Sequence, residues 1–215
     1  MKQYTFSILL FLSLTTYGQK YIDTVKGIFD NTTSWYKETE KWDNKMGLAN
    51  LLQSKDSLRI RFRDGTNIVD IVLNKQGQLK ANSYSYLFKL NKKHKALKVI
   101  YKKIPIDKEI ALQFLDTLYK LGIPDFYDGY KIPNYPITVD GVVYDFEFST
   151  FSSYKNISFA NPSEALDLKE GKTVYNFVNY ADKLLGLKNN FNELKLTLTK
   201  GTYKIAGMLI YTVRQ

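Results

Sequence analysis

Hydrophobic residues alternate with polar ones over several short stretches of this chain, and recur every three to four positions over others. Alternation predicts half-buried strands, whereas the longer period predicts helices that pack by one face. The predicted strands cover residues 58–63, 66–71, 78–90, 97–104, 137–139, 142–150, 156–160, 193–199 and 203–213. The predicted helices cover residues 34–53, 107–121 and 172–185. This order predicts an α+β fold, in which about three helices pack on an antiparallel sheet of hairpins and a meander.

Glycine and aspartate mark where these elements begin and end. Asp64-Gly65 between two alternating stretches is a strong hairpin signal, and a two-residue loop would place Arg59 opposite Asp70. Gly122 follows the second predicted helix, in the position where a left-handed residue ends a helix. Residues 19–33 carry no pattern that assigns them to a helix or a strand.

The first residues have the pattern of an export signal. Lys2 precedes an apolar run over residues 5–14, and small residues precede Gln19. Such a run is too short to span a bilayer as a helix but fits the core of a signal peptide. We therefore expect residues 1–18 to be a signal peptide and residues 19–215 to be one exported domain, periplasmic, outer-membrane-associated or extracellular. No later run reaches the ~20 apolar residues of a spanning helix, so no transmembrane segment is expected in the mature chain.

The lack of cysteine and the net charge limit the kinds of active site and partner that this chain can have. The chain has no cysteine, which excludes a thiol nucleophile, a cysteine-ligated zinc site and an iron–sulfur cluster. A domain of this length can bury a core large enough to fold without disulfides. The net charge of +10 attracts anionic partners. Outside the cytoplasm these are anionic lipid, polysaccharide or surface proteins, so export argues against nucleic acid. The pattern does not indicate an oligomeric state.

His94 is the single histidine and lies in a lysine-rich turn, Asn91–Lys95, between two predicted strands. A Ser-His-Asp triad needs an imidazole oriented by a carboxylate, and a zinc site usually needs several imidazoles. We therefore predict a solvated turn, with no metal centre and no cofactor. The lysines around it (Lys89, Lys92, Lys93, Lys95, Lys98, Lys102 and Lys103) would steer anionic surfaces or simply remain solvated.

One pair of carboxylates is placed for catalysis. Asp145 and Glu147 are two positions apart in an alternating stretch, so both side chains lie on one face of a strand, with backbones about 6.5–7 Å apart. This spacing allows the carboxyl separations that glycosidases use. The alternative is a solvated sheet face opposite an aromatic core face, because Tyr144, Phe146 and Phe148 already account for the alternation.

Three of the four arginines in the chain share a single face of one predicted strand. Arg59, Arg61 and Arg63 alternate with apolar residues, and Asp70 across the hairpin would neutralise Arg59. Arg61 and Arg63 would then remain to bind carboxylate or phosphate groups of a polyanion. The alternative is an exposed charged face that keeps the sheet from pairing at its edge.

The second candidate binding surface is a proline-rich loop over residues 122–136. Tyr127, Tyr130 and Tyr135 would be held ready to stack on a sugar or a peptide. The alternative is that the loop packs its own aromatic rings to stay ordered.

The leader that ends Tyr17-Gly18 before Gln19, and the Lys- and Tyr-rich chain after it, resemble exported proteins of the Bacteroidota. This resemblance implies an envelope or extracellular location and no particular activity. We expect a non-catalytic domain that binds an anionic or glycan-like ligand through Arg61, Arg63 and the tyrosine loop. The alternatives are a carbohydrate-active enzyme that uses Asp145 and Glu147, and a structural or assembly component of the envelope.

Overall fold

The computed structural model describes residues 21–23, 32–136, 141–205 and 209–214, which form a curled sheet with helices on both faces. The α+β class is confirmed. The strands are β1 (Tyr21–Asp23), β2 (Leu58–Arg63), β3 (Asn67–Leu73), β4 (Leu79–Leu90), β5 (Ala96–Pro105), β6 (Val143–Ser149), β7 (Ser153–Ala160), β8 (Gly201–Ile205) and β9 (Leu209–Val213). The helices are α1 (Thr32–Lys45), α2 (Lys108–Lys120), α3 (Lys169–Leu185) and α4 (Leu187–Leu196). In these described ranges no helix is both long and apolar enough to cross a membrane.

The sheet is organised around β4, its longest strand. Neighbouring strands follow the order β1-β7-β6-β2-β3-β4-β8-β9, and β5 pairs with the other edge of β4. All these pairs are antiparallel except β1 with β7. On one edge of β4, β3 pairs as far as Ser85 and β8 then pairs with Phe88 and Lys89. The change of neighbour along one edge accompanies the curl of the sheet.

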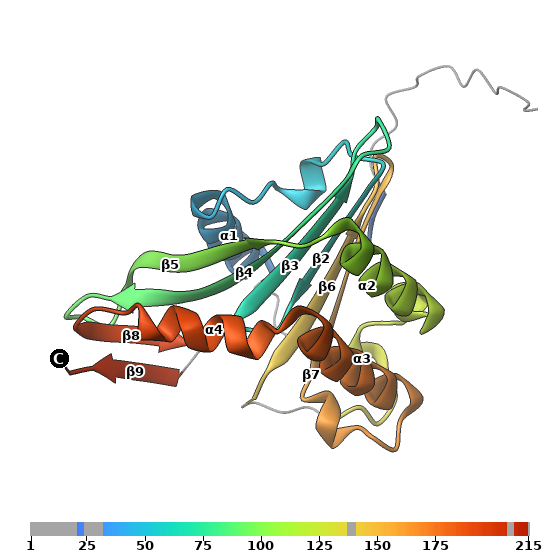
Figure 1. Ribbon diagram of the computed structural model, residues 1–215. Coiled ribbons are helices and arrows are strands. Elements are labelled where there is room, and N and C mark those ends of the chain that lie inside the picture. Colours follow the sequence, from blue (N-terminus) through green and yellow to red (C-terminus); the bar gives the residue numbers. More distant parts are fainter. Residues whose placement is uncertain (1–20, 24–31, 137–140, 206–208, 215) are drawn as a thin grey trace, which may run out of the picture.

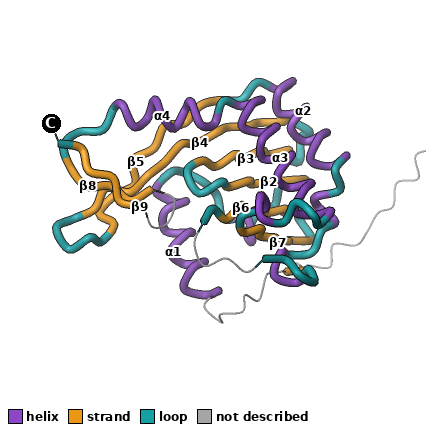
Figure 2. The backbone as a smooth tube through the Cα atoms, turned by 90° about the horizontal axis from the view of Figure 1, so that it is seen from below, coloured by secondary structure: helices purple, strands orange, loops and turns teal. Residues whose placement is uncertain are grey.

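One face of the sheet carries the main hydrophobic core, under α2 and α3. Phe62 and Phe146 of neighbouring strands have ring centroids 5.0 Å apart, and Phe114 of α2 lies 5.1 Å from Phe177 of α3. A smaller core lies under α4 and consists of Leu87, Phe191, Leu194, Leu198, Tyr203 and Ile205. α1 lies on the opposite face (Figures 1 and 2), so the two faces are covered by different parts of the chain.

The hairpin of β2 and β3 forms where it was predicted, but its register differs. Arg61, not Arg59, lies opposite Asp70. The prediction made Asp64 and Gly65 the two loop residues. In the structure the Asp64 amide donates to the Asn67 carbonyl at 3.1 Å, so the turn lies one residue later, and the Asp64 side chain accepts hydrogen bonds from the backbone amides of Thr66 and Asn67. This displacement shifts the register by two residues, which leaves every side chain on its predicted face.

The prediction of a strand over residues 193–199 is wrong, because most of these residues belong to a fourth helix, α4. Leu187, Phe191 and Leu194 are buried at helical spacing against the sheet. Gly186, with φ of +62°, ends α3 and lets the chain turn directly into α4. The alternation at residues 193–199 was therefore too short to separate a strand from a helix.

The remaining predicted elements agree with the pattern apart from two differences, and β1 lies in a stretch for which no element was predicted. The first helix ends at Lys45 rather than residue 53, because Gly47 takes a left-handed φ of +75°, and a 3-10 turn, η1 (Leu51–Gln53), follows. The stretch predicted as one strand over residues 203–213 is the hairpin of β8 and β9. Residues 137–139, predicted as a strand, lie outside the described residues.

Candidate functional site

The polar face of the sheet is buried under α1 and η1. Arg59, Arg61 and Arg63 alternate with Ile60 and Phe62 along β2, so the three guanidinium groups share this face. Arg61 is 1% exposed and Arg63 is 6% exposed. A charge buried to this extent requires partners of opposite charge, and neighbouring carboxylates provide them.

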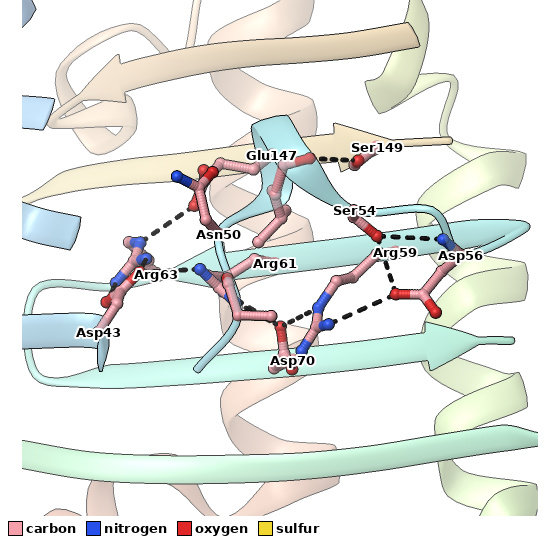
Figure 3. Close-up of polar contacts among 12 residues, drawn as sticks. Asp43, Asn50, Ser54, Asp56, Arg59, Arg61, Arg63, Asp70, Glu147 and Ser149 are labelled. Atoms are coloured by element: carbon pink, nitrogen blue, oxygen red, sulfur yellow. Dashed lines mark hydrogen bonds and ion pairs between the residues drawn. The ribbon is translucent and has the colours of Figure 1, made fainter. Parts of the chain in front are cut away.

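Asp43 of α1 pairs with two of these arginines (Figure 3). Its Oδ2 accepts hydrogen bonds from Arg61 Nη1 at 2.8 Å and from Arg63 Nη2 at 2.5 Å. Its Oδ1 accepts from Arg63 Nη1 at 3.1 Å. In the segment that follows α1, the backbone carbonyl of Ala49 also accepts a hydrogen bond from Arg61 Nη2, at 2.9 Å. These contacts fasten the end of α1 to the middle of the sheet.

Carboxylates on the strands complete the network. Arg61 Nε donates to Asp70 Oδ1 at 3.1 Å, and Arg63 Nε donates to Glu147 Oε2 at 3.3 Å. The Tyr154 hydroxyl donates to Glu147 Oε1 at 2.8 Å, so both oxygens of this carboxylate are bonded. Burial by itself lowers the pKa of Arg63, but the facing carboxylates outweigh burial and raise it above its ordinary value. Arg63 is therefore a permanent buried cation.

Asp70 also neutralises Arg59, as the sequence predicted, although the two are not opposite each other. Arg59 Nη2 lies 2.6 Å from Asp70 Oδ2, and Asp56 approaches Arg59 Nη1 at 3.4 Å. Burial acts to raise the pKa of Asp70, but the charges and hydrogen bonds of Arg61 and Arg59 prevail and lower it. The arginine row is thus compensated along its whole length.

A cavity of about 660 Å³ adjoins this network between α1, the curled sheet and the β8–β9 hairpin. We call it the α1 cavity; Trp42, Arg63, Tyr86, Phe88 and Asp145 are among its lining residues. The Phe88 ring centroid lies 4.9 Å from that of Trp42 and 5.7 Å from that of Tyr86. An aromatic cluster from α1 and β4 therefore shares the cavity with the charged groups of β2 and β6.

Asp145 is a buried acid of this cavity whose pKa is shifted by its surroundings. It is 9% exposed, and its carboxylate accepts a short hydrogen bond from the Ser158 hydroxyl. Burial raises the pKa of Asp145 to about 6, although the Ser158 hydrogen bond and the charge of Arg63 act in the opposite direction. Burial likewise raises the pKa of Tyr86 to about 12. Asp145 thus exchanges its proton near neutral pH, while Tyr86 keeps its proton.

The predicted site residues do not form one surface. Arg61 and Arg63 are buried in the ion-pair network rather than exposed to a ligand, and of the two only Arg63 lines the α1 cavity. Tyr127 is 74% exposed, Tyr130 is partly exposed, and Tyr135 is buried and donates a hydrogen bond to a backbone carbonyl. None of the three tyrosines lines the α1 cavity.

A polar chain nevertheless connects the tyrosine loop with the cavity. Asp128 of this loop accepts hydrogen bonds from the backbone amides of Tyr130 and Ser158, at 3.0 and 2.8 Å. The side chain of Ser158 donates in turn to Asp145. Burial raises the pKa of Tyr130, and the charges of Asp128 and Asp145 add to this rise. The loop therefore bonds β7 at Ser158, whose side chain in turn bonds Asp145 on the neighbouring strand β6.

Asp145 and Glu147 share one face of β6, as predicted, but that face is buried and not solvated. The aromatic face opposite them is core, because Phe146 and Phe148 are buried there. Asp145 lines the α1 cavity, whereas Glu147 lines a separate space of about 20 Å³. The two carboxyl groups therefore have different surroundings.

Three aromatic residues and one acid of this site were missed in the sequence. Trp42 and Asp43 are adjacent in the first helix, where the helical spacing of apolar residues places Trp42 on the packed face and Asp43 carries no signal. Tyr86 and Phe88 lie in the alternation of β4, which does mark them as sharing one face. Asp43 could have been located only by assuming that Arg61 and Arg63 are buried, because buried arginines need a carboxylate and one had to come from outside the sheet.

The other sequence candidates lie at the surface. His94 is exposed in the β4–β5 turn with φ of +55°, as predicted for a solvated turn. In the lysine cluster around it, Lys102 forms an exposed ion pair with Glu193 at 2.6 Å. Within the part of the chain that the structure describes, no group of three or more His, Cys, Asp or Glu side chains could hold a metal ion.

No protein-family model matches this chain, and no curated protein matches it significantly. The inference about function therefore comes from the residues around the α1 cavity.

Replacing Asp43 by Ala is expected to lower the free energy of unfolding by about 3–5 kcal/mol, because Arg61 and Arg63 would lose a shared buried partner. The matched control is Asp56→Ala at the more exposed end of the network, which should lower it by less than about 1 kcal/mol. Urea denaturation of both variants measures the difference. Equal losses would contradict the central role of Asp43.

The wild-type protein is expected to lose stability relative to Asp145→Asn as pH rises from 3.8 to about 6. The native state holds this proton more tightly than the unfolded state, so the unfolded state binds fewer protons in that window and the free energy of unfolding falls with pH. Above the window the difference should stay constant. Denaturation of both proteins across this range measures it, and parallel pH profiles would contradict a raised pKa at Asp145.

Proposed function

We propose that this chain is an exported, non-catalytic domain that binds a glycan-like ligand in the α1 cavity. The observation that carries the proposal is the cavity itself, where the aromatic side chains Trp42, Tyr86 and Phe88 share a space of about 660 Å³ with Asp145 and Arg63. This volume is in the range of small-molecule sites, which combine apolar walls with a few polar groups. Sugars present both an apolar face and hydroxyl groups to such a surface.

The charges around the cavity support a glycan-like ligand over an anionic one. The arginines expected to attract an anion are already paired with Asp43, Asp70 and Glu147. The acidic residues that line the cavity are Glu38, Asp43 and Asp145, against two basic ones, Arg63 and Lys204. An anion would therefore meet more negative than positive charge, whereas hydroxyl groups can donate to carboxylates and accept from a guanidinium.

One observation favours a second candidate function, a carbohydrate-active enzyme. Burial raises the pKa of Asp145 to about 6, which suits an acid catalyst near neutral pH. A two-carboxylate mechanism also needs Glu147, but both oxygens of Glu147 are bonded, to Arg63 and to Tyr154, and Glu147 lines the smaller space. Binding is therefore better supported than catalysis.

Export to the envelope or beyond is part of the proposal, as the leader over residues 1–18 and the resemblance to exported proteins of the Bacteroidota suggest. The exposed lysines of the β4–β5 turn, Lys92, Lys93 and Lys95, would draw the protein toward anionic lipid, polysaccharide or surface proteins. This steering is separate from the α1 cavity, because the lysines lie on an exposed turn.

Val143→Trp is expected to abolish glycan binding without unfolding the protein. Val143 lines the α1 cavity and is exposed, so an indole there takes up part of the space beside Asp145 and obstructs a ligand while removing no core contact. Binding of the full chain to a printed array of neutral and acidic oligosaccharides measures the effect. The matched control is Leu166→Trp, an equally exposed site that does not line the cavity.

The expected result is binding to neutral oligosaccharides that Val143→Trp removes and Leu166→Trp retains. Binding that both variants retain, or none at all, would overturn the proposal. Release of free sugar from the bound oligosaccharide, abolished by Asp145→Asn while binding persists, would instead establish the enzyme.

The export proposal has its own test. When the full coding sequence is expressed in a bacterial host with a general secretion pathway, the protein is expected outside the cytoplasm, with Gln19 as its first residue. Intact-mass spectrometry of the fractionated cells measures this. A cytoplasmic protein that retains residues 1–18 would contradict export.

A further inference from the structure

The strand β9 at one end of the sheet has an exposed apolar surface and an open edge. It pairs with β8 on one side, and no other strand of the described chain pairs with it. Leu209 is 64% exposed, Ile210 is 54% exposed, and Tyr211 is exposed as well. The backbone N–H and C=O groups along the outer edge of such a strand can pair with another strand.

Other edges of this sheet are protected in ways that β9 is not. The outer edge strand β5 carries Lys98, Lys102 and Lys103, and charged side chains of this kind discourage strand addition. The edge of β7 is covered in part by β1, and near Ser158 by the 3-10 turn at Gly129 of the tyrosine loop. In contrast, β9 has the sequence Leu-Ile-Tyr-Thr-Val, without a charge or a proline.

The charges carried by the β8–β9 hairpin and the residues that flank it in the sequence have one sign. Residues 194–215 contain no Asp or Glu, but they include Lys200, Lys204 and Arg214. Lys200 and Arg214 are exposed on either side of the β8–β9 hairpin, and Lys204 lies opposite Ile210 in the hairpin. A strand with acidic side chains that lies along β9 would face these cations, and a strand with basic side chains would be repelled.

We propose that β9 is a docking edge for an extended acidic segment of a partner protein, which adds to the sheet as a further strand. A second copy of this chain is a poorer occupant, because each copy carries +10 and its own β9 region has no acidic residue. A membrane surface is also a poorer occupant, because lipid chains cannot hydrogen-bond the open backbone edge. Strand addition satisfies both the backbone groups and the apolar side chains.

The test uses the full chain and a fluorescent peptide of alternating Glu and Val, with binding followed by anisotropy. Saturable binding is expected for this peptide and not for the same peptide with Lys in place of Glu. Ile210→Glu, which places a charge of the peptide's own sign on the edge strand without removing a buried side chain, should weaken binding at least about tenfold. The matched control Leu97→Glu, which makes the same charge change at an exposed apolar residue on β5, should bind as the wild type does.

N-methylation of the peptide at alternate residues separates strand addition from simple charge attraction, because it removes backbone donors and leaves every charge in place. Binding that survives N-methylation, or that Ile210→Glu leaves unchanged, overturns the proposal. Dimers detected by sedimentation and lost in Ile210→Glu would assign the edge to a second copy. Ile210-dependent binding to phosphatidylglycerol vesicles would assign it to a membrane, and either result overturns the acidic partner. Ile210 does not line the α1 cavity, so the variant leaves every residue of the proposed glycan site in place, and the failure of either proposal can be told from the failure of the other.

Discussion

The carboxylate of Asp43, shared between Arg61 and Arg63, is the interaction on which the polar half of this protein depends. β2 places two guanidinium groups on a face that is closed off from water, and the sheet alone does not supply enough carboxylates at their tips. Asp43 comes from outside the sheet, on α1, so neutralising the arginines and docking the helix are one event. The same contact positions Trp42, and hence one wall of the α1 cavity.

The arginines of β2 form their ion pairs with carboxylates of the protein itself, so few charged groups remain to act on a ligand. Arg63 is held by Asp43 and Glu147, while Asp145 accepts a hydrogen bond from the neutral hydroxyl of Ser158. Burial raises the pKa of Asp145, and the charge of Arg63 does not offset burial there. Asp145 and Glu147, two residues apart on one strand, therefore differ in their partners, because the guanidinium of Arg63 bonds Glu147.

The sequence predicted much of the fold, since alternation and helical spacing are local signals. It placed Asp145 and Glu147 on one face and the arginines on one face, both correctly. It could not show that this face is covered, because polar side chains in alternation look the same under a helix as in water. Nor could it find Asp43, whose role arises only when α1 meets β2. The α4 error has a similar cause, since Leu194 and Leu198 fit either a strand or a helix until their packing partners are known.

The curl of the sheet explains why the cavity and the open edge occur at the same end of the molecule. β3 stops pairing with β4 at Ser85, and β8 takes over that edge only from Phe88. Between them lies the turn that contains Gly65, which lines the α1 cavity together with Lys204 and Leu209 of the β8–β9 hairpin. In this hairpin β8 is anchored by the buried Tyr203 and Ile205, whereas β9 pairs with no described strand other than β8. A strand added along β9 would extend the sheet beside the α1 cavity. Partner binding would then act on the wall formed by the β8–β9 hairpin, which is the wall that the rest of the fold constrains least.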